Sequence, residues 1–144
     1  MKEAHVRELL KAGLLRPRGK DISRARSLVE AAEKISGVVA SMRVTENSAT
    51  VVFRELYECL RQLGDAKWWL LGYESLSHEA SMRILMEEDI RNKVKLNHLD
   101  RFRHIRNDAN YRGYLISVSN AIEMRDFWNL CGKELLGNLK RAVR

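Results

Sequence analysis

Residues 101–114 carry the side chains whose types and spacing are best suited to chemistry. These fourteen residues include four arginines, one histidine, two asparagines and two tyrosines. If they form a helix, an apolar stripe recurs at spacings of three and four, made by Leu99, Phe102, Ile105 and Ala109. A second stripe, rotated by about 100° from the first, carries Arg103, Arg106, Asn107 and Asn110. Donors and fixed positive charge beside an apolar seam favour an anionic oxygen, although a solvated basic helix face is the simpler interpretation.

The elements that must position this segment are expected to be helices. The chain has 144 residues, with one proline and eight glycines, which fits a single domain with few helix breakers. Apolar spacing predicts helices over residues 3–15, 22–42 and 49–71, and a short helix capped by Ser77. The central helix should end near residues 111–113, and Ser117 or Ser119 should open the last one. The short turn after residue 42 makes the two long helices antiparallel, so the fold class is an all-α bundle.

A break at residues 16–20 combines a proline, a glycine and three cations. It divides the chain into an N-terminal arm with a short helix, residues 1–20, and a helical bundle, residues 21–144. Within the bundle, Gly37 predicts either a close approach of two helices or a weak point in its own helix. Trp68 and Trp69 are adjacent and cannot both face one core, so one of them is expected at an interface between chains or against the arm.

Charge and cysteine content limit the partners and the setting. With 26 Lys and Arg against 19 Asp and Glu, the formal net charge is +7, which permits nucleic acid or another polyanion. Cys59 and Cys131 match no ligand spacing and are expected to be buried free thiols in a reducing, cytoplasmic setting. Neither a signal peptide nor a membrane span is expected. We expect no metal and no cofactor, because the chain has no phosphate-binding loop and its histidines lack metal-site spacing: His5, His78, His98 and His104.

The order of these elements, with two quoted motifs, resembles the HEPN superfamily of small helical prokaryotic domains. A leucine-rich opening at residues 8–15 leads into an alanine-rich helix, and a second long helix ends at Gly-Tyr-Glu-Ser-Leu-Ser-His-Glu-Ala, residues 72–80. Then comes Arg-Asn-Asp-Ala-Asn-Tyr-Arg-Gly, residues 106–113, whose Arg-Asn and Tyr-x-Gly are the most specific part. The resemblance covers nearly the whole chain from about Glu8. It implies a bundle of four to five helices, a homodimer and a basic cleft near the dimer axis.

Many HEPN proteins cleave RNA without metal, through an arginine and a histidine a few residues later, and this chain departs from that pattern. Arg106 and Asn107 match, but Asn110, Tyr111 and their neighbours stand where the histidine would be, and neither named residue is a base at neutral pH. His104 lies two residues before Arg106, nearly on the opposite side of the helix. His78 belongs to another helix and needs the fold to bring it close.

The sequence therefore leaves three functions open and does not decide whether the protein is an enzyme. The first is a dimeric module that binds RNA or nucleotide without efficient cleavage. The second is a metal-independent endoribonuclease of the toxin type found in toxin–antitoxin pairs. The third is an interaction partner of a separately encoded nucleotidyltransferase. The catalytic candidates are Arg106, Asn107, Asn110, Tyr111, His104 and His78. The candidates for RNA or nucleotide binding are Arg101, Arg103, Arg106, Asn107, Asn110 and Arg112.

Overall fold

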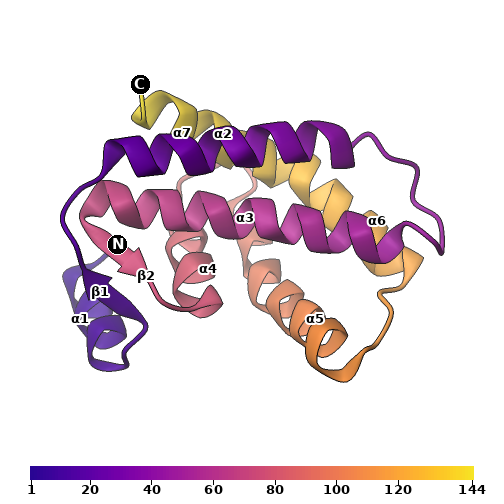
Figure 1. The fold of residues 1–144 in the computed structure, drawn as a ribbon, viewed down its shortest axis with the longest axis horizontal. Helices are drawn as coiled ribbons and strands as arrows, with labels where there is room; N and C mark the ends of the chain where they lie inside the picture. Colours follow the sequence, from indigo (N-terminus) through magenta and orange to yellow (C-terminus); the bar gives the residue numbers. More distant parts are fainter.

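The computed structural model describes all 144 residues, and the fold is helical apart from one two-stranded sheet (Figure 1). The elements in chain order are α1 (Glu3–Lys11), β1 (Leu15–Pro17), α2 (Ile22–Val39), α3 (Ala49–Leu71), β2 (Tyr73–Ser75), α4 (His78–Met86), η1 (Lys93–Asn97), α5 (His98–Arg112), α6 (Val118–Phe127), η2 (Trp128–Gly132) and α7 (Lys133–Ala142). The last three follow one another without a break and form one long helix that contains a π-helical turn. The predicted all-α class is confirmed, and no helix has the length and apolar character needed to cross a bilayer.

Helix α2 runs along the top of the molecule and α3 runs antiparallel to it directly below, as predicted (Figure 1). Asp21 caps α2 by accepting a hydrogen bond from the backbone N–H of Arg24 at 2.9 Å. Helix α2 ends three residues before the predicted limit at Met42, whereas α3 has the predicted bounds. Gly72, with φ +97°, ends α3 because glycine takes the left-handed conformation without strain. Of the two alternatives for Gly37, the close approach of helices is absent, since a Cβ there would meet nothing within 4 Å.

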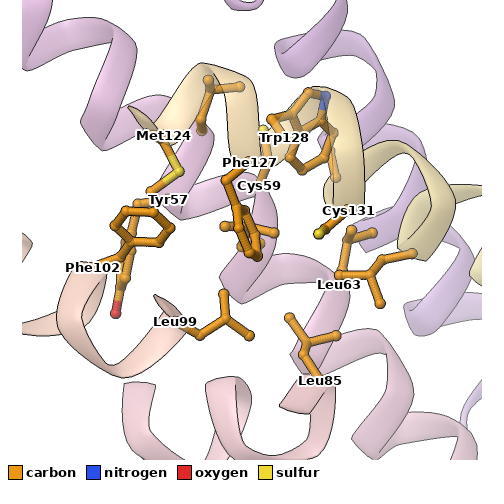
Figure 2. Close-up of a cluster of buried hydrophobic side chains, with 14 of the residues drawn as sticks. Tyr57, Cys59, Leu63, Leu85, Leu99, Phe102, Met124, Phe127, Trp128 and Cys131 are labelled. Atoms are coloured by element: carbon orange, nitrogen blue, oxygen red, sulfur yellow. The ribbon is translucent and has the colours of Figure 1, made fainter. Parts of the chain in front are cut away.

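The core is built around α3, which contacts α2, α4, α5 and α6. Leu63 of α3, Leu85 of α4, Leu99 of α5 and Phe127 of α6 belong to one cluster of buried side chains, part of which Figure 2 shows. Both cysteines are free and buried in this core, as predicted. Burial raises the pKa of the Cys59 thiol to about 12, so it is an unreactive apolar group.

Helix α4 lies unusually close to α3 at Gly64. A Cβ on Gly64 would stand 2.1 Å from the carbonyl oxygen of Ser81, so only glycine fits there. The Ser81 hydroxyl donates to Asp65 at 2.5 Å, one residue further along α3. This packing fixes the first turn of α4, which begins at His78.

The N-terminal arm is attached to the body by a sheet and by a small apolar cluster. Strand β1 pairs with β2 antiparallel, with Leu15 opposite Ser75. Trp68 packs among the arm residues and donates its indole N–H to the carbonyl of Ala80 at 2.9 Å. Trp69 instead joins the main core, where the Arg24 guanidinium lies 4.6 Å from its ring centroid. The expectation that one tryptophan packs against the arm is confirmed, and neither tryptophan is left for an interface between chains.

Candidate functional site

Helix α5 presents the two stripes that the sequence predicts. Leu99 and Phe102 are buried, and Phe102 makes edge contacts with Phe53 at 5.8 Å and Phe127 at 5.3 Å. Ile105 and Ala109 pack against the same core. The neighbouring stripe is half-buried rather than fully solvated, and it consists of Arg103, Arg106, Asn107 and Asn110. The helix ends at Gly113, whose φ of +70° stops it at the predicted place.

A groove of about 430 Å³ separates this stripe from α3. Its lining residues are Thr50, Val51, Arg54, Glu55, Glu58, Arg106 and Asn110. Arg106 forms no ion pair, and its guanidinium carbon lies 5.8 Å from the Tyr57 ring centroid. The Asn110 amide oxygen is buried without a hydrogen-bond partner. Because buried polar groups are normally paired, this amide and this guanidinium are the groups best placed to receive a ligand.

The charges around the groove leave a small positive excess. Glu58 is neutralised by Arg61, which also pairs with Asp65 at 2.6 Å. Arg103 pairs with Asp100 at 3.0 Å, so its charge is already balanced within the chain. The lining groups that form no ion pair are Arg54, Arg106 and Glu55. Two cations and one carboxylate therefore face an incoming ligand.

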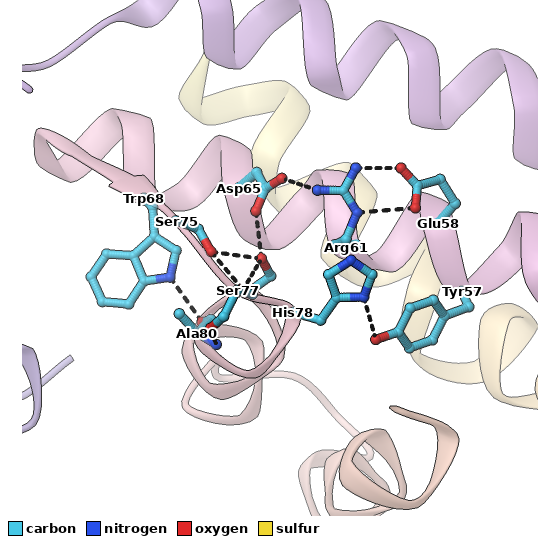
Figure 3. A network of polar contacts seen from close by, with 10 residues as sticks. Tyr57, Glu58, Arg61, Asp65, Trp68, Ser75, Ser77, His78 and Ala80 are labelled. Atoms are coloured by element: carbon cyan, nitrogen blue, oxygen red, sulfur yellow. Dashed lines mark hydrogen bonds and ion pairs between the residues drawn. The ribbon is translucent and has the colours of Figure 1, made fainter. Parts of the chain in front are cut away.

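The fold brings His78, and not His104, toward Arg106. The Tyr57 hydroxyl lies 3.1 Å from His78 Nδ1, and the two rings are 5.7 Å apart (Figure 3). Tyr57 is also the ring that Arg106 covers. The pKa of His78 is lowered, first by burial and then by the positive charges of Arg106 and Arg61. His104 is exposed and lies 3.5 Å from Asp100, on the solvent side of α5.

The Tyr57 contact determines which nitrogen of His78 carries the proton. Burial raises the pKa of Tyr57 to about 12, so its hydroxyl keeps its proton at neutral pH. Tyr57 is buried, and its hydroxyl has no hydrogen-bond partner other than His78. Donation to Nδ1 gives the hydroxyl proton its acceptor, and in that arrangement the proton of the neutral imidazole is on Nε2. In this state Nε2 of His78, the ring nitrogen that does not contact Tyr57, is a hydrogen-bond donor and not a base.

The remaining predicted residues are spread around α5 rather than gathered in the groove. Arg101 is paired with Glu123 and lies near His98, at the other end of the helix. Arg112 is exposed, with Asp108 3.9 Å away. Tyr111 is 82% exposed and points no group into the core. Asn107 shares the half-buried stripe but does not line the groove.

Sequence reasoning missed the contribution of α3. Charged residues on this helix recur at spacings of four, three and four: Arg54, Glu58, Arg61 and Asp65. This period places them on one face, so the pattern was available as a signal. Tyr57 gave no such signal, because an apolar-spaced tyrosine is indistinguishable from core until its hydroxyl partner is known.

Comparison of the chain with protein-family models, curated proteins and solved structures found no match. The HEPN resemblance thus rests on the quoted motifs and on helix order. Within the structure, no three His, Cys, Asp or Glu side chains gather closely enough to hold a metal ion. The chemistry of the site has to be judged from its own geometry.

Proposed function

We propose that the protein is a HEPN-like module that binds RNA or a nucleotide through the groove between α3 and α5, without efficient cleavage. The observation that carries this proposal is Arg106, half-buried beside the unpartnered amide of Asn110 and without any acidic partner. A phosphate would gain charge-assisted hydrogen bonds from this guanidinium, while a ribose hydroxyl or base N–H could satisfy the amide oxygen. The net charge of +7 would favour association with a polyanion.

The state of His78 supports binding over cleavage. Metal-independent cleavage of RNA needs a base that takes the proton of the 2′-hydroxyl as that oxygen attacks the phosphorus. His78 offers Nε2–H on its free side, and Tyr57 stays protonated to about pH 12. His78 could donate its Nε2–H to a phosphate oxygen, but neither His78 nor Tyr57 accepts the 2′ proton in this state.

The second candidate is the metal-independent endoribonuclease, and one observation favours it. Tyr57 contacts both His78 and Arg106, so a histidine stands beside the arginine although the motif itself lacks one. Cleavage would require the imidazole proton to move from Nε2 to Nδ1. This exchange would cost the hydrogen bond that Tyr57 donates.

Fluorescence anisotropy with a short labelled RNA tests the proposal. With about three phosphate contacts, affinity should fall roughly 20-fold between about 50 and 200 mM salt. The same RNA incubated with excess protein in a chelator should stay intact over hours. Absence of binding at low salt would refute the proposal, and cleavage in chelator would establish the second candidate.

The partners implied by the resemblance are further proposals. The homodimer can no longer be argued from the tryptophan pair, because the chain buries both rings itself. A separately encoded nucleotidyltransferase is the partner that the third of the open functions would require. Co-purification of the two proteins from their native host would test that assignment.

A further inference from the structure

The segment that follows the groove exposes an unusual amount of apolar surface. Tyr111, Tyr114 and Leu115 are 82%, 58% and 87% exposed, within five consecutive residues. Neither tyrosine ring contacts another aromatic ring of the chain. Single exposed apolar residues are ordinary, but a contiguous group of them marks a contact surface.

This segment is attached to the groove at both ends. Asn110, which lines the groove, directly precedes Tyr111. At the other end, the backbone N–H of the buried Ile116 donates to the hydroxyl of Thr50 at 3.1 Å, and Thr50 lines the groove from α3. Figure 1 shows the connection from α5 to α6 passing from the end of α5 toward the start of α3. The segment that carries the exposed rings therefore adjoins the groove at both of its ends.

The positive charges beside the segment favour a polyanion over a second copy of this chain as its partner. Arg112 lies between the two tyrosines, and Arg54 and Arg106 lie in the groove without ion pairs. A second copy of this chain placed on the segment would bring a second set of these cations to the same face. A polyanion would instead be attracted, and aromatic rings beside a cationic groove are the combination that binds single-stranded nucleic acid.

On the basis of the proposed RNA-binding function, we infer that the site takes a single-stranded segment, with a phosphate at Arg106 and bases stacked on Tyr111 and Tyr114. In a duplex the base faces are covered by neighbouring pairs, so the rings would gain nothing from it. Stacking needs no particular base, and RNA and DNA single strands share this chemistry. The inference thus predicts a preference for single strands over duplexes, with little dependence on sequence.

Anisotropy titrations of the full chain with a 12-nucleotide unstructured RNA, the same sequence in DNA, and a 12-base-pair RNA duplex test this inference. Tyr111→Ala and Tyr114→Ala should each weaken single-strand binding by at least about fivefold. Both should leave duplex binding nearly unchanged, and Tyr111→Phe should retain wild-type affinity. Leu115→Ala is the matched control, because Leu115 is about as exposed as Tyr111 but has no ring to stack. The DNA strand shows whether the sugar also contributes to recognition.

The outcomes distinguish failure of this inference from failure of the proposed RNA-binding function. If the wild type binds no nucleic acid, the proposed function fails and the inference with it. If the RNA strand and duplex bind equally, and the tyrosine variants change neither, only this inference fails. If Leu115→Ala weakens binding as much as the tyrosine variants, and all three dissociate a dimer in light scattering, the segment is an interface between copies and the inference is wrong.

Discussion

Replacing Gly64 with alanine tests how α3 positions α4 and, through it, His78. The added Cβ would stand 2.1 Å from the Ser81 carbonyl oxygen, whereas ordinary contacts begin at 3.4 Å, so α4 would have to move by more than 1 Å. The obstacle is backbone, which no rotamer change relieves. Overpacking of this kind lowers the free energy of unfolding by about 3 kcal/mol at the upper end of its usual range. The better helix propensity of alanine offsets about 1 kcal/mol of that change. A net loss of about 2 kcal/mol should lower Tm by roughly 4–8 °C.

Gly37→Ala is the matched control, because Gly37 also lies inside a long helix but has open space around its Cα. It should raise Tm by about 2–4 °C, through helix propensity alone. Thermal melts followed by circular dichroism measure both variants. The NMR signals of the His78 ring should shift in Gly64→Ala and stay in place in Gly37→Ala. Equal stability of Gly64→Ala and the wild type would refute the described contact between α3 and α4.

Three further predictions concern charge and assembly. The pKa of His78 is lowered by folding, so the unfolded chain binds that proton more readily and stability falls as pH drops below about 6.5. His78→Gln should lose less stability than the wild type between about pH 7.5 and 5.5 in denaturant titrations, and an equal loss would contradict the burial of this ring. Glu55→Gln removes the unpaired carboxylate of the groove and should strengthen RNA binding a few-fold, whereas weaker binding would show that Glu55 contacts the ligand. Light scattering at micromolar concentration should give twice the chain mass of 16.7 kDa if the proposed homodimer forms, and a monomer would contradict it.

Most helices follow from local sequence, because their signals are local. The bounds of α3 were predicted from an uninterrupted apolar period and from Gly72, which ends the helix. The pairing of β1 with β2 could not be predicted in this way. Each strand has only three residues, and Leu15 meets Ser75 only because the arm folds back across the body. At the π-helical turn after α6, the Trp128 ring lies where a side chain on Gly132 would stand, and apolar spacing alone does not reveal this contact.

Only the part of the groove that α5 contributes follows from the sequence of a single helix. Helix α5 supplies Arg106 and Asn110 on the expected stripe, since their spacing is a property of one helix. The ion pair that occupies Arg103 was foreseeable, because Asp100 precedes it by three residues. The position of His78 was not, because it depends on how α4 packs on α3 and on the hydroxyl of Tyr57. The sequence identifies the groups on each helix, and only the packing shows which groups from different helices meet.

Arg106→Ala, measured for RNA affinity and Tm on the same sample, tests the central claim most directly. Affinity should fall by about tenfold or more, because a charge-assisted contact to phosphate is lost. The fall in RNA affinity between about 50 and 200 mM salt should be roughly 20-fold for the wild type and roughly sevenfold for Arg106→Ala. Tm should change by less than about 2 °C, because Arg106 forms no ion pair within the chain. Arg7→Ala, which removes the same charge from the exposed face of α1, should leave the affinity within about twofold of the wild type. Unchanged affinity together with a large fall in Tm would show that Arg106 is structural and that the groove does not bind RNA through it.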